Sequence, residues 1–203
     1  MGYNIVILGA GVSGKGSAIL AKKHGYDVFV SEKATIAKGT KEYFNELGID
    51  WEENKHTLSK MHGAKYVIKS PGIPSRIPLI EKLKSLQIPL VSEIEFASKY
   101  TDAVLIGITG SNGKTTTAML THHILKKAGY DVGLVGNIGN SFAKDVAEND
   151  HEYYVLEISS FQLDDIINFA PKIGVITNIT PDHLDRYDHD FSQYLKSKLR
   201  INQ

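Results

Sequence analysis

The stretch "AVLIGITGSNGKTTTAML" at residues 103–120 places an apolar run, a glycine turn and a helical pattern in direct succession. This order is the setting of a phosphate-binding loop (P-loop), in which backbone N–H groups at a helix N-terminus face phosphate oxygens. The "GKT" at 113–115 matches the end of the pattern G-x-x-x-x-G-K-[ST], whereas Ile108 replaces its first glycine, and "TGS" at 109–111 supplies the turn. We therefore predict a triphosphate site here, with a surface turn that holds no ligand as the alternative.

The side chains of this loop suit ATP and Mg²⁺. Gly110 and Gly113 leave room for backbone amides to approach the phosphates. Lys114 brings a positive charge to the β and γ phosphates, and Thr115 offers a hydroxyl to the metal. The predicted ATP-binding residues are Gly110, Ser111, Asn112, Gly113, Lys114, Thr115 and Thr116.

Short apolar runs alternate with helical patterns along the whole chain. Several runs are apolar on successive residues, which is typical of strands buried on both faces of a parallel sheet. We expect strands at 4–9, 26–31, 64–70, 88–92, 103–109, 131–136, 153–159 and 172–179, and helices at 13–24, 40–47, 76–86, 114–129, 141–149 and 190–201. This alternation predicts an α/β fold.

An earlier loop, "GAGVSGKGS" at 9–17, also follows a strand and opens a helix. Its glycines form G-x-G-x-x-G, and Glu32 ends the next strand, which favours a dinucleotide site. The loop also fits part of the triphosphate pattern, but Gly16 stands where a metal-binding hydroxyl is required. Two interpretations remain: a helix N-terminus open to a phosphate or diphosphate, and glycines that serve only strand–helix packing.

Because each glycine loop starts its own series of strands and helices, we expect two domains. Residues 1–92 are predicted to form a Rossmann-like parallel-sheet domain. Residues 93–203 are predicted to form part of a P-loop NTPase-like α/β domain, and the boundary lies between 92 and 102. The chain ends in the helical pattern at 190–201 without a closing strand, so we expect a fragment of a longer protein.

Composition excludes several classes of protein. Lys plus Arg equal Asp plus Glu, at 23 each, so no field of one sign attracts nucleic acid or an anionic membrane. The absence of cysteine excludes disulfides and Cys-ligated metals. The sequence has neither a signal-peptide pattern nor an apolar run of the about 18 residues that a bilayer requires. We expect a cytoplasmic monomer with no nucleic-acid or membrane partner.

Polar residues follow further strands of the second half. Glu157 ends a buried run beside the P-loop, where the second metal ligand of such sites lies. Ser159 or Ser160 then suits the N-cap of a helix. His183 follows the next strand, which we expect to neighbour the strand of Glu157, and is therefore a candidate for metal or substrate. Asn137, in the glycine turn "GNIG", offers an amide to a ligand.

Seven blocks, spread over the whole chain and in the family's order, resemble the Mur ligase family, and within it the members that add D-glutamate. The blocks are "GAGVSG" (9–14), "SPGIP" (70–74), "TGSNGKTT" (109–116), "GNIG" (136–139), "EISSFQL" (157–163), "DHLDRY" (182–187) and "YLKSKLRI" (194–201). Each block alone is short, but the combination is specific, and "SSFQL" favours the members that add D-glutamate over their relatives.

The resemblance implies an ATP-dependent amide ligase that joins D-glutamate to UDP-N-acetylmuramoyl-L-alanine through an acyl phosphate, in peptidoglycan precursor synthesis. The first domain then holds the UDP group and not NAD, and a third, amino-acid-binding domain is missing, so residues 1–203 alone are expected to be inactive. The implied substrate-binding residues are Val12, Ser13, Glu32, Ser70, Pro71, Gly72, Asn137, Ser159 and Gln162. The implied metal ligands are Thr115, Glu157, His183 and Lys198, and the implied catalytic residues are Lys114, His183 and Lys198.

Other interpretations stay open. Residue types alone predict that Lys196 and Lys198 are solvated, whereas the resemblance implies that Lys198 is carbamylated and holds Mg²⁺. The first glycine loop and Glu32 also fit an NAD-dependent oxidoreductase. A regulatory P-loop module without acyl chemistry, and a Mur-family ligase for another amino acid, are the remaining alternatives.

Overall fold

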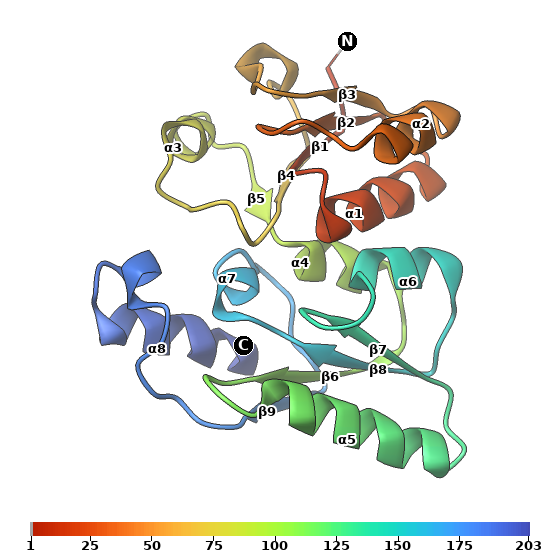
Figure 1. The fold of residues 1–203 in the computed structure, drawn as a ribbon, viewed down its shortest axis with the longest axis vertical. Helices are drawn as coiled ribbons and strands as arrows, with labels where there is room; N and C mark the ends of the chain where they lie inside the picture. The colour runs from red at the N-terminus through yellow and green to blue at the C-terminus, as the bar shows by residue number, and fades with distance from the viewer. Residues whose placement is uncertain (1) are drawn as a thin grey trace.

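The computed structural model describes residues 2–203 and contains two parallel β-sheets, one above the other along the long axis of the molecule (Figure 1). The first sheet has the order β3-β2-β1-β4-β5 and the second the order β7-β8-β6-β9. The strands are β1 (Ile5–Leu8), β2 (Val28–Ser31), β3 (Asp50–Glu52), β4 (Tyr66–Lys69), β5 (Leu90–Val91), β6 (Val104–Thr109), β7 (Val132–Gly136), β8 (Tyr153–Glu157) and β9 (Ile173–Ile176). The predicted α/β fold of parallel sheets is confirmed.

Helices connect successive strands of each sheet. They are α1 (Val12–Lys23), α2 (Lys38–Glu46), α3 (Pro78–Ser85), α4 (Glu93–Ala97), α5 (Lys114–Lys127), α6 (Phe142–Glu148), α7 (Ser160–Leu163) and α8 (Phe191–Leu199), with short 3₁₀ helices η1 (Leu58–Lys60), η2 (Ser98–Tyr100), η3 (Leu184–Tyr187) and η4 (Arg200–Asn202). We call β1–β5 with α1–α3 the first sheet unit, and β6–β9 with α5–α8 the second sheet unit.

The predicted elements differ from the structure mainly at their ends. Most strands and helices are one to several residues shorter than expected, and the expected strand at 88–92 is reduced to β5. The sequence analysis missed β3, because its "DWE" at 50–52 has no apolar run and pairs only with β2. The prediction that strands are buried on both faces holds for β1 and β2, whose residues are all buried.

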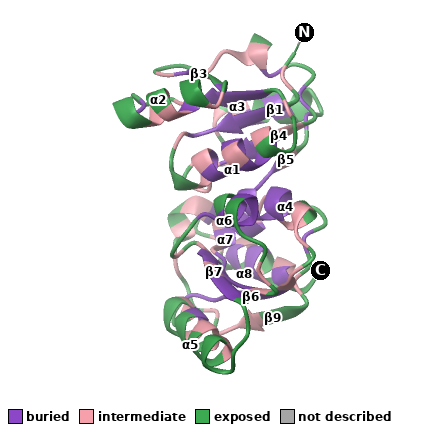
Figure 2. Ribbon diagram, turned by 90° about the vertical axis from the view of Figure 1, so that its right-hand side faces the viewer, coloured by how far each residue is buried: buried purple, intermediate pink, exposed green. Residues whose placement is uncertain are grey.

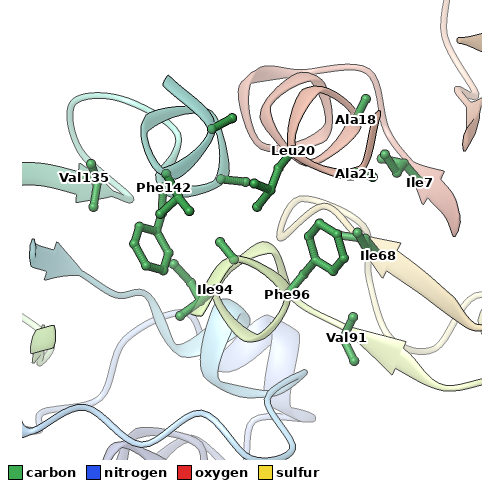
Figure 3. Close-up of a cluster of buried hydrophobic side chains, with 14 of the residues drawn as sticks. Ile7, Ala18, Leu20, Ala21, Ile68, Val91, Ile94, Phe96, Val135 and Phe142 are labelled. Carbon is green, nitrogen blue, oxygen red and sulfur yellow. The ribbon is translucent and has the colours of Figure 1, made fainter. Parts of the chain in front are cut away.

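The two sheet units share one apolar core. Side chains from α1 and α6 meet those of α4, which lies between the sheets; Leu20, Ile94, Phe96 and Phe142 are among them (Figure 3). Figure 2 shows α4 as a buried helix at this junction. Gly16 is needed here, because a Cβ on it would collide with the Ser141 side chain at the start of α6. The glycine that fails the triphosphate pattern in the first loop therefore serves helix packing.

Glu95 of α4 ties the junction to the second sheet unit. Its side chain is fully buried, and Oε2 accepts the backbone N–H groups of Ile167 (2.9 Å), Asn168 (2.9 Å) and Phe169 (2.7 Å). Burial opposes the charge of Glu95, but these amides and Lys99 outweigh it and lower the pKa of the carboxyl. None of the helices within residues 2–203 has the length and apolar composition needed to cross a bilayer.

Candidate functional site

The P-loop lies between the end of β6 and the start of α5. Gly110 has φ 148° and Gly113 has φ 82°, conformations that side chains other than glycine rarely adopt. A Cβ on Gly110 would also collide with Thr177 of the loop that follows β9. Gly113 caps α5 without any side-chain hydrogen bond, so the first-turn amides of α5 lack a capping acceptor. This geometry suits a phosphate group at the N-terminus of α5.

The loop after β9 braces the P-loop from outside. The N–H of Asn112 donates to Asn178 Oδ1 (3.0 Å), and Thr177 Oγ1 donates to the carbonyl of Asn112 (2.6 Å). Ser111 Oγ donates to the carbonyl of Thr180 (2.7 Å). These bonds fix the backbone of the turn before any ligand binds, which reduces the ordering cost of binding.

Lys114 is folded back over its own loop. Its Nζ donates to the carbonyl oxygens of Gly110 (2.9 Å) and Ser111 (2.8 Å), and the side chain is half-buried. These carbonyls are neutral partners for a full positive charge. A phosphate at the helix N-terminus offers the ammonium a stronger, charge-assisted bond.

Glu157 gathers two of the predicted site residues. It ends β8, is 2% exposed, and lies beside Ile108 of β6 in the sheet register. Its Oε2 accepts the Thr115 hydroxyl (2.7 Å) and its Oε1 accepts the amide of Asn137 (2.8 Å). A carboxylate and a hydroxyl are oxygen ligands of the kind that Mg²⁺ prefers. Among residues 2–203 no group of three or more His, Asp or Glu side chains is arranged for a metal, so Glu157 and Thr115 supply only part of a coordination sphere.

Lys198 is buried, at 2% exposure, and the prediction of a solvated side chain is wrong. Lys196, one helical half-turn away, is exposed as expected. Lys198 Nζ donates to Gly110 O (2.7 Å) and to Thr109 Oγ1 (3.2 Å), so it approaches the P-loop from behind. Burial, together with the positive charge of Lys114, lowers the pKa of Lys198 to about 8. The helical pattern of α8 does not show which of its lysines faces inward, since that depends on where the helix packs.

His183 lies at the start of η3 with a left-handed backbone, φ 49°, and an exposed side chain. Its ring is 5.3 Å from that of Phe161. The expectation that its strand neighbours the strand of Glu157 is wrong: β9 pairs with β6, and β6 separates it from β8. The contacts of His183 do not reach Glu157, Thr115 or Lys198.

Ser159 and Gln162 bond to each other. Ser159 caps α7, its Oγ accepting the N–H of Gln162 (3.3 Å), while Gln162 Oε1 accepts the N–H of Ser159 (3.0 Å). This capping box satisfies the helix N-terminus. Both residues thus have a structural role at the carboxyl edge of the second sheet, and their substrate contacts remain predictions.

The first glycine loop brings together the remaining predicted residues. Val12 and Ser13 open α1, whose N-cap Gly11 has no side-chain hydrogen bond, and Val12 is 69% exposed. Glu32 accepts the N–H of Ala10 through Oε2 (2.8 Å) and so holds the loop itself. Ser70 stands against the loop from β4: its Oγ is buried without a hydrogen-bond partner among residues 2–203. Pro71 and Gly72, which follow, are more exposed.

Two cavities of about 600 Å³ each lie between the sheet units. One joins Val12 of α1 to the glycine turn after β7, and two further lysines line it, Lys15 and Lys144. The sequence analysis did not single these lysines out, although Lys15 occupies the lysine position of the partial triphosphate pattern. The other cavity joins the turn after β4 to α7, η3 and α8, and no residue of the predicted site lines it.

Comparison with known families decides the relationship. A family model of the MurD N-terminal domain matches residues 4–77, and a model of the Mur ligase middle domain matches residues 108–203. The chain belongs to the Mur ligase family. This confirms the resemblance that the seven sequence blocks indicated.

Curated relatives in this family carry one name. The chain is 58% identical over 201 residues to the UDP-N-acetylmuramoylalanine–D-glutamate ligase of Christiangramia forsetii, covering 99% of this chain and 45% of that protein. It is 56% identical over 199 residues to the ligase of the same name from Bacteroides fragilis, covering 98% and 45%. The chain thus spans a little under half the length of these Mur ligases.

Solved Mur ligase structures share the fold. The UDP-N-acetylmuramate–alanine ligase MurC of Thermotoga maritima gives a TM-score of 0.59 at 22% identity, covering 98% of this chain and 46% of that one. The UDP-N-acetylmuramate:L-alanyl-γ-D-glutamyl-meso-diaminopimelate ligase (MPL) of Neisseria meningitides also gives 0.59, at 20% identity, covering 100% and 69%. At these identities the comparison supports the architecture alone.

Proposed function

We propose that the chain is part of an ATP-dependent ligase that joins D-glutamate to UDP-N-acetylmuramoyl-L-alanine, a step of peptidoglycan precursor synthesis. One observation carries the proposal. A P-loop with an open helix N-terminus, its Lys114 bonded only to neutral loop carbonyls, lies beside the Thr115–Glu157 pair, in a chain whose relatives bear this ligase name. A nucleotide triphosphate and its metal need these groups together.

The reaction requires activation of a carboxylate, which is a poor acyl donor. A carboxylate oxygen of the sugar nucleotide attacks the γ-phosphorus of ATP, and the bond from that phosphorus to the bridging oxygen of ADP breaks. The amino group of D-glutamate then attacks the acyl carbon, loses a proton to solvent, and inorganic phosphate leaves. The contribution of Lys114 is to leave Gly110 O and Ser111 O and neutralise the charge of the transferring group.

The donor set fits a magnesium ion in part. Thr115 Oγ1 and Glu157 Oε2 are hard oxygen atoms already in contact, and Lys198 adds a further anionic oxygen ligand if its amine is carbamylated. Bound Mg²⁺ supplies positive charge that offsets the phosphate oxygens. Asn137 orients Glu157 through its amide. We keep His183 as a metal ligand and catalytic residue on the resemblance alone, since its ring lies beside Phe161 and has no contact with Glu157.

The first sheet unit holds the UDP group in this proposal. We assign residues 1–92 to that domain and residues 93–203 to the ATP-binding domain. We also propose that the protein acts as a monomer, and that it acts in the cytoplasm because ATP is supplied in that compartment. Support comes from the uncapped N-terminus of α1 and the unpartnered Ser70 Oγ beside Gly9, which suit a diphosphate. Glu32 accepts the N–H groups of Ala10 and Ala34, one on each carboxylate oxygen, which weighs against a ribose contact and a uracil contact alike.

Ligand titration tests this function. The chain is titrated by calorimetry with ATP and Mg²⁺, with UDP-N-acetylmuramoyl-L-alanine, and with NADH. We expect the first two to bind at separate sites without competing, and NADH not to bind. Saturable binding of NADH that excludes the sugar nucleotide would contradict the ligase and favour the oxidoreductase.

Carbamylation of Lys198 gives a second test. A lysine whose pKa is about 8 is substantially neutral at pH 8–9, and only the neutral amine reacts with CO₂. With ¹³C-bicarbonate at pH 8.5 we expect a carbamate resonance from Lys198 in addition to that of the N-terminal amine, and it disappears below about pH 7 as the Lys198 amine is protonated. The Lys196→Met variant keeps both resonances. A Lys198→Met variant with the same resonances as the unaltered protein would exclude this assignment.

A further inference from the structure

A second buried lysine has no part in the chemistry above. Lys69 ends β4 and is 2% exposed. The other residues of this strand, Tyr66, Val67 and Ile68, carry no charge that could pair with it. Its Nζ lies 2.9 Å from Asp165 Oδ2, which belongs to the second sheet unit just after α7. Neither residue was singled out by the sequence analysis. A buried ammonium is costly unless it is paired and hydrogen-bonded, so its position has a structural reason.

The ammonium of Lys69 closes the turn that follows its own strand. It donates to the carbonyl of Ile73 (2.8 Å), and the N–H of Ile73 donates to the carbonyl of Ser70 (3.0 Å). The N–H of Ser70 in turn donates to the carbonyl of Leu8 on β1 (3.0 Å). The turn Ser70–Gly72, which the resemblance assigns to the substrate, therefore rests on the side chain of Lys69.

Asp165 connects this turn to the second sheet unit. Its Oδ2 is buried, and the Lys69 ammonium 2.9 Å away offsets its negative charge at close range. Burial raises the pKa of the Asp165 carboxyl, and Lys69 opposes that rise. The backbone of Asp165 is fixed as well, because its carbonyl accepts the N–H of Ser92 (2.7 Å) at the start of α4.

A second contact holds the same turn from the outer side. Arg186 of η3 donates through Nη2 to the carbonyl of Pro71 (3.3 Å), and its guanidinium lies 4.3 Å from the centre of the Phe161 ring. Phe161 also contacts His183. Arg186 thus contacts the turn directly, Asp165 acts on it through Lys69, and both side chains line the cavity that adjoins it.

We propose that Lys69 and Asp165 are positioning residues that set the Ser70–Gly72 turn for the sugar nucleotide and fix it relative to the ATP-binding unit. The proposal rests on the proposed function for the identity of the ligand. The pair does not touch the reacting atoms. Its effect is to present the turn in the binding conformation before the ligand arrives, which lowers the ordering cost of binding.

The test removes both charges at once, so that no charge is left buried and unpaired. We compare the double variant Lys69→Met/Asp165→Asn with Lys196→Met/Asp185→Asn, which makes the same changes at two exposed residues of the same cavity. In the first variant we expect the amide hydrogen of Ile73 to exchange at least about tenfold faster. We also expect the Kd for UDP-N-acetylmuramoyl-L-alanine to rise about tenfold, while the Kd for ATP stays unchanged. The control variant matches the unaltered protein in both.

Unchanged exchange at Ile73, or faster exchange with unaltered affinity for the sugar nucleotide, overturns the inference. If the unaltered protein does not bind the sugar nucleotide, the proposed function fails, and exchange at Ile73 still decides whether the pair holds the turn. A second measurement needs no variant. The protons of the Lys69 ammonium should exchange slowly with water. Its ¹⁵N signal should shift when the sugar nucleotide is added, but not when ATP is added. Rapid exchange of these protons contradicts the proposal.

Discussion

Replacing Lys114 with alanine should lower kcat of the proposed ligase reaction, assayed with the full-length protein, by about 10³-fold or more, while the fold is retained. Its ammonium lies within 2.9 Å of two P-loop carbonyls, and a phosphate bound there replaces those carbonyls as its partner. Charge that develops during phosphoryl transfer then loses its main protein counterion. Because the lost contact is strongest in the transition state, the fall should appear in kcat more than in KM.

The matched control is Lys126→Ala, at the exposed far end of the same helix, which should leave both constants unchanged. Rates are measured as ADP release that depends on both the sugar nucleotide and D-glutamate. A Lys114→Ala enzyme with normal turnover would mean that the P-loop only regulates, as in the module without acyl chemistry.

The Glu157→Gln variant should lose about 10²–10³-fold in kcat and need a higher Mg²⁺ concentration to reach its maximum rate. Glutamine keeps the shape of the side chain but removes the negative charge at the end of β8. Its amide nitrogen would also replace one of the two carboxylate oxygens that now accept from Thr115 and Asn137, so one of these donors would face another donor. The loss of charge and the mispaired donor act together, since the site is buried.

Rate against Mg²⁺ concentration is the measurement for Glu157→Gln. Glu152→Gln provides the control, because Glu152 is exposed and lies just before the first residue of β8, at the end of the strand opposite Glu157. An unchanged Mg²⁺ profile in Glu157→Gln would remove Glu157 from the metal site.

The local sequence pattern was sufficient to predict the units in which a strand, a glycine loop and a helix follow one another. The runs of successive apolar residues in β1, β2 and β6, and the glycines at the two loops, depend on neighbours along the chain. The P-loop and the acid at the end of β8 could therefore be placed from sequence, because both follow a buried strand directly. The strand β3 was missed because a three-residue edge strand needs no apolar run.

Relationships between distant elements could not be predicted in the same way. In the order β7-β8-β6-β9, β6 lies between β8, which ends in Glu157, and β9, which precedes His183. No local sequence pattern shows which strands pair. The burial of Lys198 depends on α8 packing behind the P-loop, and that of Lys69 depends on Asp165, nearly one hundred residues later. The need for glycine at position 16 also depends on a distant residue, because a side chain there would collide with Ser141 at the start of α6.

The central claim is that a triphosphate binds the amides at the start of α5 while a sugar nucleotide binds the first glycine loop. A crystal structure of the protein with a non-hydrolysable ATP analogue, Mg²⁺ and UDP-N-acetylmuramoyl-L-alanine tests it most directly. We predict phosphates against Gly110–Thr115, with Lys114 turned from its loop carbonyls to the γ-phosphate, and the diphosphate of UDP at the N-terminus of α1. An empty P-loop at saturating nucleotide, or the triphosphate bound at Gly11 instead, would contradict the account.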